Sequence, residues 1–300
     1  MRADDLFTKI TAELIDDIET GSAGTWRMPW HTLADAGTPE SVGGRRYRGL
    51  NSLWLPMVAA ANGWTSGIWA TYRGWQRHGA QVRRGERATQ VVLWKQTRPA
   101  DRNDTRDDND AERQRPRLFA RTYAVFAAEQ VDGADDLLAR RRLERDTPDR
   151  IETAERYFAA IGSRVEQGGN RAYYQPTTDE IHVPALEQFD QPAHYYATLA
   201  HEHAHWTGHA DRLSRDLTGR FGDDAYAAEE LVAELAAAMW CAQHDISAVT
   251  RPDHAAYLAG WLRILRADTR ALVTASSKAQ AAVDYLNDTA GVGADSESAA

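Results

Sequence analysis

Apolar residues recur at helical spacing through the first twenty positions of the chain. Leu6, Ile10, Leu14 and Ile18 follow one another every four residues, with mostly polar side chains between them. A stripe of this kind is typical of a helix that buries one face. We therefore predict an amphipathic helix over residues 4–20.

The next hundred residues alternate between helical and extended patterns. Apolar runs predict helices near 51–62 and 71–78, and strands near 90–96 and 118–127. Residues 101–112, between the two strands, contain mainly Asp, Arg and Asn with almost no apolar side chains, so a mobile loop is expected there. These elements predict an α+β module.

The second half predicts a hairpin followed by long helices. Residues 171–175 and 180–183 are rich in aromatic and β-branched side chains, with a turn-like segment between them. Pro192 can open the next helix and Gly208 can close it. A run of Ala, Glu and Leu over 225–239 favours another helix. A last helix is expected around Leu272, Val273, Val283, Tyr285 and Leu286. This half is thus predicted to be mainly helical, with a small antiparallel sheet.

The helix that Pro192 opens carries a metal-binding spacing. Residues 201–205 are His-Glu-His-Ala-His, and two histidines four residues apart lie on the same face of a helix. His201 and His205 can therefore bind one zinc ion, an arrangement typical of HExxH enzymes. Glu202 would then lie beside the metal, where it can take a proton from a zinc-bound water.

A catalytic zinc site needs a third protein ligand and an open position. Glu230 is the predicted ligand, and Glu234, on the same helical face, is predicted to orient a ligand histidine through its other ring nitrogen. Glu229 is an alternative to Glu230, although one residue turns a helix by about 100° and only one of the two should face the metal. Asp211 is a further alternative, because its distance from the two histidines also resembles a zinc pattern. Manganese or another divalent ion could replace zinc.

Charge divides the chain into two unlike halves. Residues 1–130 carry a net charge of +3, whereas residues 131–300 carry −12. Between residues 41 and 98 there are ten Arg and Lys residues but a single acid, Glu86. A local excess of this size indicates a surface that binds a polyanion, with phosphate groups as the first candidate.

Aromatic residues are interleaved with these basic residues. Basic side chains together with flat rings are typical of proteins that bind single-stranded nucleic acid. Trp54, Trp69 and Trp94 lie in apolar stretches and are expected in the core. The predicted DNA contacts are Trp26, Trp30, Arg45, Arg46, Tyr47, Arg48, Arg83 and Arg84. No helix-turn-helix, zinc-finger or basic-zipper pattern occurs, so duplex recognition is less expected.

Several motifs resemble one known family. Residues 5–18, 25–30, 47–51, 81–86 and 122–127 resemble the N-terminal domain of the ArdC family of antirestriction proteins. Residues 201–213 and 229–235 resemble the zincin-type metallopeptidase domain of that family. The resemblance implies a plasmid- or phage-associated protein whose N-terminal domain binds single-stranded DNA (ssDNA) and which protects incoming DNA from restriction. It also implies a gluzincin-like, zinc-dependent peptidase.

The expected organisation is two domains. An ssDNA-binding domain over 1–130, a linker over 131–149, a metallopeptidase domain over 150–290 and a disordered tail over 291–300 are predicted, and each domain is large enough to bury a core. The single cysteine excludes an intrachain disulfide, and the acidic N-terminus does not resemble a signal peptide. No apolar stretch has membrane-spanning length. A cytoplasmic protein without a membrane partner is therefore expected.

Two functional hypotheses follow from these patterns. In the first, the protein is a working peptidase that binds ssDNA and cleaves a protein or peptide. In the second, it is a non-catalytic ssDNA-binding protein whose metal site is structural or vestigial. Glu202 favours the first hypothesis, because a structural zinc site needs no base.

Overall fold

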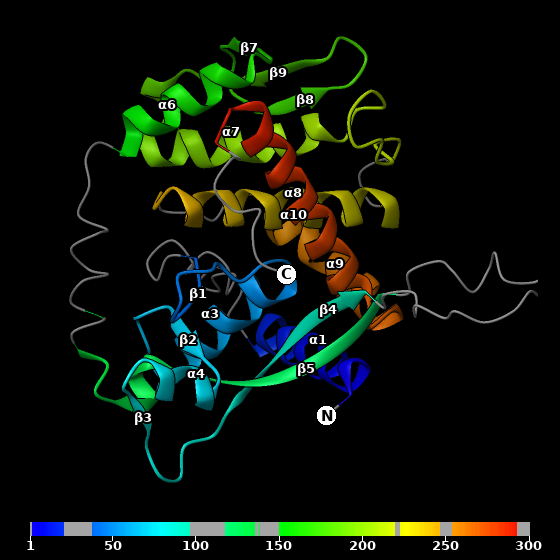
Figure 1. Cartoon of the computed structure of the whole chain (residues 1–300). Coiled ribbons are helices and arrows are strands. Elements are labelled where there is room, and N and C mark those ends of the chain that lie inside the picture. Colours follow the sequence, from blue (N-terminus) through cyan, green and yellow to red (C-terminus); the bar gives the residue numbers. More distant parts are fainter. Residues whose placement is uncertain are drawn as a thin grey trace, which may run out of the picture.

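The computed structural model describes residues 2–20, 38–96, 118–135, 138, 150–219, 223–246 and 254–292 (Figure 1). Residues 2–135 are called the N-terminal region here and residues 150–292 the C-terminal region. Figure 1 shows the two regions stacked: the C-terminal region, which holds most of the helices, lies at the top of the view, and the N-terminal region with its sheets lies at the bottom.

The N-terminal region is built around a four-stranded sheet in the order β1-β2-β5-β4. Its helices are α1 (Ala3–Thr20), α3 (Leu50–Asn62) and α4 (Tyr72–Arg77), and its strands are β1 (Glu40–Ser41), β2 (Ile68–Ala70), β3 (Gln81–Val82), β4 (Thr89–Gln96), β5 (Leu118–Ala127) and β6 (Val131–Asp132). A 3₁₀ turn, η2 (Ala128–Gln130), precedes β6, which pairs with β3. The three predicted helices and both predicted strands are confirmed. The four other strands have two or three residues each, too few for a periodic pattern.

Local sequence explains where several of these elements begin and end. The Thr71 hydroxyl accepts a hydrogen bond from the backbone N–H of Gly74 at 3.1 Å and caps the start of α4. Helix α3 ends at Gly63, whose φ of 69° lies in the left-handed region that glycine adopts without strain. Asp4 and Asp5 lie in the first turn of α1, where negative charge favours the helix.

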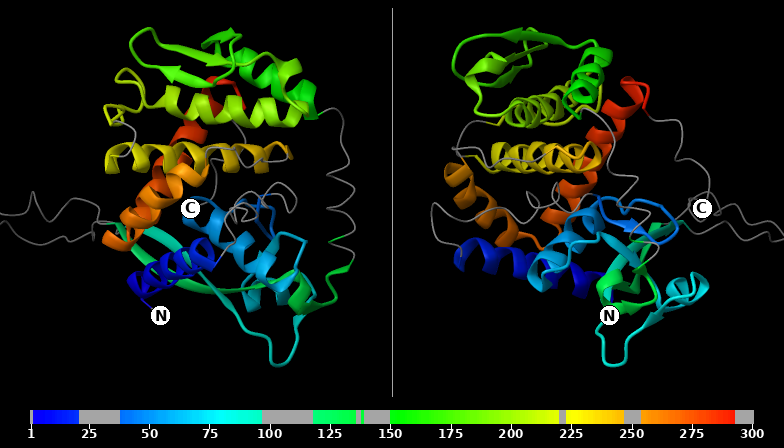
Figure 2. Two further views of the ribbon diagram at one scale, coloured as in Figure 1. Left: turned by 180° about the vertical axis from the view of Figure 1, so that it is seen from behind. Right: turned by 90° about the vertical axis from the view of Figure 1, so that its left-hand side faces the viewer.

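The C-terminal region consists of five helices and a small mixed sheet among its described residues. The helices are α6 (Arg150–Ile161), α7 (Pro192–Thr207), α8 (Asp224–Gln243), α9 (His254–Ala267) and α10 (Ala271–Thr289). The sheet contains β7 (Arg164–Gln167), β8 (Tyr173–Gln175) and β9 (Glu180–Val183), and the 3₁₀ turn η3 (Leu186–Gln188) follows it. The predicted antiparallel hairpin is β8–β9, and β7 joins β9 in parallel. Figure 2 shows α7 and α8 side by side beneath the sheet, with α10 crossing them. No helix within the described ranges is long and apolar enough to cross a membrane.

The two regions share packing. Helix α1 lies between β5 and α9, and its Thr11 hydroxyl donates to the carbonyl of Thr269 at 3.1 Å. The backbone N–H of Gly49 donates to Oε1 of Gln280 at 3.1 Å. Buried side chains from Leu6 to Leu286 form one continuous apolar cluster. The predicted domain limits stay predictions, and most of the proposed linker and tail lie outside the described residues.

Candidate metal centre and nucleic-acid interface

Three predicted ligands converge between α7 and α8. The Nε2 atoms of His201 and His205 are 3.2 Å apart. The Glu230 carboxylate approaches both rings, at 3.6 Å from Nε2 of His201 and 3.4 Å from Nε2 of His205. The ligand atoms of the three residues lie within 4.8 Å of one another. Ligands held about 2.1 Å from a tetrahedral metal ion lie about 3.4 Å apart, so this donor set fits one divalent cation.

The opposite nitrogen of each histidine faces a second carboxylate. Oε2 of Glu234 lies 3.5 Å from Nδ1 of His201, and Oε1 of Glu229 lies 3.3 Å from Nδ1 of His205. Such partners fix the orientation of a ligand ring and raise its basicity. The position of Glu234 agrees with its predicted role, while Glu229 approaches the side of His205 that faces away from Glu230.

Asp211, the other alternative ligand, lies outside this cluster. Its side chain is 88% exposed, and its nearest ionic partner is Nδ1 of His209 at 3.6 Å. The geometry therefore favours Glu230 over both alternatives. The assignment of all three ligands stays a prediction.

Arg215 supports the cluster and was not predicted from the sequence. Its side chain is only 5% exposed, and it donates to Glu229 through Nε at 3.0 Å and Nη2 at 2.9 Å. It also donates to the Thr207 hydroxyl at 2.9 Å and to the carbonyl of Ala204 at 2.5 Å. Arg215 thus joins the end of α7 to the carboxylate that faces His205. It lies in an irregular segment, so no periodic signal indicates it.

The electrostatics of the cluster favour bound positive charge. Burial lowers the pKa of His205, but the hydrogen bonds and charges of Glu229 and Glu230 outweigh it and raise that pKa to about 10. Burial acts to raise the pKa of Glu230, yet His201 and His205 hold it well below its usual range. Despite its burial, the pKa of Glu229 is lowered as well, by His205 and Arg215, so the Glu229 and Glu230 carboxylates favour a proton or a divalent cation between them and the histidines.

A cavity of about 590 Å³ borders the cluster. Glu202 is buried, 2% exposed, and lines this cavity together with His201, His205 and Glu230. Tyr173 and Tyr174 of β8 form another part of the wall. The predicted base and the predicted ligands thus share one cavity with an edge strand.

Three of the predicted DNA-binding arginines lie in the turn between β1 and α3. Arg45, Arg46 and Arg48 are exposed. Nε of Arg46 is 3.8 Å from Oε1 of Glu40, and Arg48 pairs with Asp284 of α10. Tyr47, in the same turn, is half-buried, and its burial raises the pKa of its hydroxyl to about 12. This turn therefore lies close to the C-terminal region.

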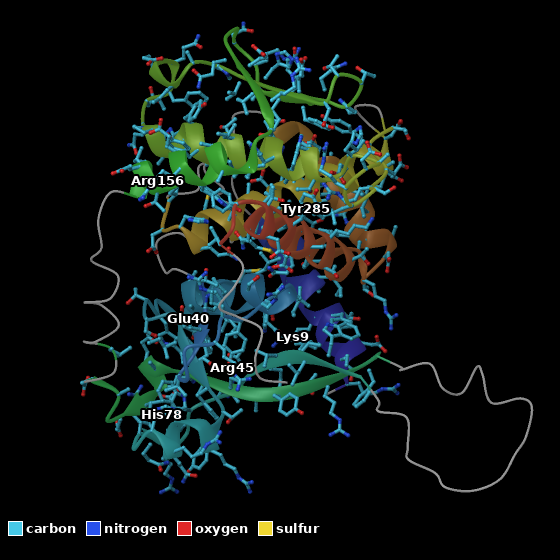
Figure 3. All side chains as sticks on the ribbon, turned by 45° about the horizontal axis from the view of Figure 1, so that its top comes forward. Lys9, Glu40, Arg45, His78, Arg156 and Tyr285 are labelled. Atoms are coloured by element: carbon cyan, nitrogen blue, oxygen red, sulfur yellow. The ribbon has the colours of Figure 1, made fainter. Side chains whose placement is uncertain are left out.

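The other predicted arginines lie elsewhere. Arg83 pairs with Glu86 at 3.1 Å and donates to the carbonyl of Glu129, so it stabilises the contact between the turn after β3 and the residues before β6. Arg84 is exposed. Figure 1 shows β3 at the end of the N-terminal region that faces away from α10, and in Figure 3 His78, which precedes β3, is farther from the C-terminal region than Glu40. The two arginine groups do not form one patch. Trp26 and Trp30 lie outside the described residues.

The three tryptophans expected in the core differ in how far they are buried. Trp54 and Trp69 are buried, as predicted. Trp94 is 51% exposed, so the prediction was wrong for this residue. The reason is its position in the second half of β4: Val91 and Val92, earlier on this strand, are buried, whereas Leu93 and Trp94 lie where β4 pairs with the part of β5 that β2 does not reach. An apolar sequence pattern does not show where along a strand its packing against the core ends.

Each of the two regions matches a known protein family. Residues 4–126 match the family model for the N-terminal domain of anti-restriction factor ArdC, and residues 152–278 match that for a zincin-like metallopeptidase. The metal-free crystal structure of the antirestriction ArdC protein from plasmid R388 is similar at a TM-score of 0.77 and 35% identity, over 96% of this chain and 98% of that one. This chain belongs to the ArdC family.

Further relatives of this ArdC-family chain extend the comparison. The Mn(II)-bound structure of the same R388 protein is similar at a TM-score of 0.74 and 34% identity, over 98% of this chain and all of that one. The uncharacterized protein y4eC of Sinorhizobium fredii is 45% identical over 94% of this chain and 92% of its own length. DNA primase TraC of Escherichia coli is 35% identical over 93% of this chain, which spans only 26% of TraC. The zincin-like domain and the Mn(II)-bound relative together indicate a divalent metal.

Proposed function

We propose that this chain is an antirestriction protein that binds ssDNA and carries a working zinc-dependent peptidase, and that it protects incoming plasmid or phage DNA in the cytoplasm. One observation carries the enzymatic part: Glu202 and the three ligand residues line a single cavity. Its partners are ssDNA and a protein or peptide substrate. Manganese or another divalent ion can take the place of zinc, because the same donor set suits several such ions.

The residues of the cavity have distinct roles in this proposal. A divalent metal held by His201, His205 and Glu230 would act as a Lewis acid and lower the pKa of water. Glu202 takes the proton of the attacking water and passes it to the leaving amine. Strand β8 is at the edge of its sheet and lines the cavity, so an extended peptide can pair with it.

Surface chemistry supports the ssDNA part of the proposal. Arg45, Arg46 and Arg48 are exposed on one turn, where they can contact phosphate groups. Stacking on aromatic rings requires unpaired bases, so single strands should bind better than duplex, with little sequence preference. The similarity to part of TraC, which is named DNA primase, supports the nucleic-acid part of the proposal.

The alternative is a non-catalytic ssDNA-binding protein with a structural or vestigial metal site. The exposed arginines are compatible with this alternative, because they can bind DNA whether or not the protein hydrolyses a peptide. A structural zinc site, however, usually has four protein ligands and no open position. Here three predicted ligands and a buried glutamate border a cavity, an arrangement that favours catalysis.

The test is a peptidase assay on the full chain with and without an oligonucleotide, together with metal analysis. Glu202→Gln should keep the metal and lower the rate of casein hydrolysis by about 10²- to 10⁴-fold, because only the base is removed. Glu187→Gln is the matched control, since Glu187 is exposed on η3 and does not line the cavity.

Two results would contradict the peptidase proposal. One is a Glu202→Gln protein that hydrolyses casein as fast as the unchanged chain. The other is a metal-loaded chain that binds ssDNA and hydrolyses no protein under any of these conditions, which would leave the alternative as the better description.

A further inference from the structure

A second cavity, of about 750 Å³, lies where the two regions meet. Strand β4 and helices α1 and α3 of the N-terminal region border it, and α10 of the C-terminal region borders it too. Its lining includes Phe7, Arg48, Asn51, Trp94, Ser277 and Lys278. It is separate from the metal-site cavity, with which it shares no lining residue, and is called the inter-region groove below.

Trp94 gives the inter-region groove a flat aromatic surface. Half of this side chain is exposed, which is unusual for so large an apolar group. The ring stacks on buried Phe7, with centroids 6.2 Å apart and planes 21° apart. One side of the indole is thus supported by the core, and the exposed part offers a surface on which an unpaired base can stack.

The backbone of β4 beside the groove already has partners. The Asn51 side chain donates to the carbonyl of Val92 at 2.6 Å and accepts from its N–H at 2.9 Å. Nε1 of Trp54 donates to the carbonyl of Gln90 at 3.0 Å. A peptide that added as a new strand would need these backbone groups. The groove therefore fits a ligand that binds by stacking and charge better than an extended peptide.

Cations from both regions border the groove. Arg48 comes from the turn before α3 and Lys278 from α10, and both are exposed. Asp284, the carboxylate in the lining, pairs with Arg48. Arg45 and Arg46, three and two residues before Arg48, are exposed as well. The combination of a flat ring and flanking cations matches the two chemical features of a nucleic-acid strand.

We propose that ssDNA occupies the inter-region groove, with a base stacked on Trp94 and phosphate groups at Arg48 and Lys278. The binding site then includes a residue of the metallopeptidase region, Lys278, and is not confined to the N-terminal region. This inference rests on the proposed ssDNA binding and adds its location.

The test is fluorescence anisotropy of the full chain with a labelled oligothymidylate of about 20 nucleotides over a range of salt concentrations. Trp94→Ala should weaken binding about 5- to 150-fold with little change in salt dependence, because a stacking contact is lost. Lys278→Ala should reduce the slope of log affinity against log salt by about 0.7, the value for one phosphate contact to a single strand.

Two exposed residues outside the groove are matched controls. Tyr72→Ala removes an aromatic ring that is 43% exposed on α4, and Arg156→Ala removes a cation on α6 (Figure 3). Both should bind as the unchanged chain does. Thermal melting checks that every variant is folded, which is expected because none of the four deleted side chains is buried.

The results separate this inference from the proposed function. If the full chain binds the oligonucleotide and both Trp94→Ala and Lys278→Ala bind equally well, the groove is not the site, while ssDNA binding stands. If the full chain shows no salt-sensitive binding to single strands, both proposals fail.

Discussion

Charged side chains are arranged in opposite ways in the two regions. At the metal centre, Arg215 and Glu229 are 5% and 10% exposed, and each charged group faces an opposite charge. In the turn before α3, Arg46 and Arg48 are 52% and 56% exposed, and each has one acidic partner at the surface. Buried charges must be paired, so their positions are fixed by the fold. Exposed pairs contribute about 0–1 kcal/mol each, so a ligand can replace such a partner at little cost.

The comparison also shows that an arginine in a basic stretch need not bind a ligand. Arg83 pairs with Glu86 and donates to the carbonyl of Glu129, so part of the basic excess stabilises a turn. Arg215, in the acidic half of the chain, is buried and binds Glu229, the carboxylate that faces His205. Local charge density in the sequence therefore indicates a surface that could bind a polyanion. The role of an individual arginine follows from its burial and its partners in the structure.

The largest expected effect tests the buried side of this comparison. Glu230→Ala should lower metal affinity by more than about 100-fold, because even the removal of a residue that only supports a ligand costs about 10- to 100-fold. Asp211→Ala should leave the metal content unchanged, because Asp211 is exposed and outside the cluster. Inductively coupled plasma analysis of dialysed proteins measures both. Full metal content in Glu230→Ala with loss in Asp211→Ala would reverse the assignment.

A second prediction compares one buried and one exposed arginine. Arg215→Ala should lower the free energy of unfolding by about 3–5 kcal/mol, since it leaves the buried Glu229 charge without its arginine. It should also weaken metal binding by about 10- to 100-fold through His205. Arg84→Ala, at an exposed site, should change stability by about 0.5 kcal/mol at most. Urea unfolding with and without added metal measures both effects. Equal destabilisation by the two variants would contradict the distinction between the regions.

The smallest effect concerns His244 of the C-terminal region, which feels the positive charge of Arg46 in the N-terminal region. Its ring packs against Trp240 and Tyr157, with centroids 4.5 and 4.8 Å away. Burial, followed by the positive charge of Arg46, lowers the pKa of His244 to about 4. The unfolded chain therefore binds a proton on this residue at higher pH than the folded one. The resulting stability is complete above about pH 6.5 and is lost as the pH falls toward 4, by at most about 3 kcal/mol.

The variant His244→Phe isolates the pH-dependent part of the stability that comes from His244, since phenylalanine keeps an aromatic ring and cannot titrate. The difference in unfolding free energy between the unchanged chain and the variant should fall as the pH is lowered from 7 to 4.5. A difference that stays constant over that range would show that His244 does not titrate as described.

The sequence by itself predicted the elements and residues that depend on local spacing. The stripe from Leu6 to Ile18 formed α1, and Pro192 and Gly208 marked the limits of α7. His201 and His205 face the same side because four residues make about one helical turn. Glu230 and Glu234 approach the same histidine for the same reason. Both regions also matched the family that their motifs resemble.

Contacts between distant segments were decided only by the tertiary structure. Glu229 differs from Glu230 by one position, and it was the packing of α8 against α7 that placed each at a different nitrogen of His205. Arg215 gained its role from an irregular segment that folds back on α7. The exposure of Trp94 depends on where along β4 the packing against the core ends, and the inter-region groove depends on how α10 packs against α3. Such features leave no periodic pattern along the chain. They depend on residues that lie as much as 231 positions apart in the sequence, which the burial of one shared core brings together.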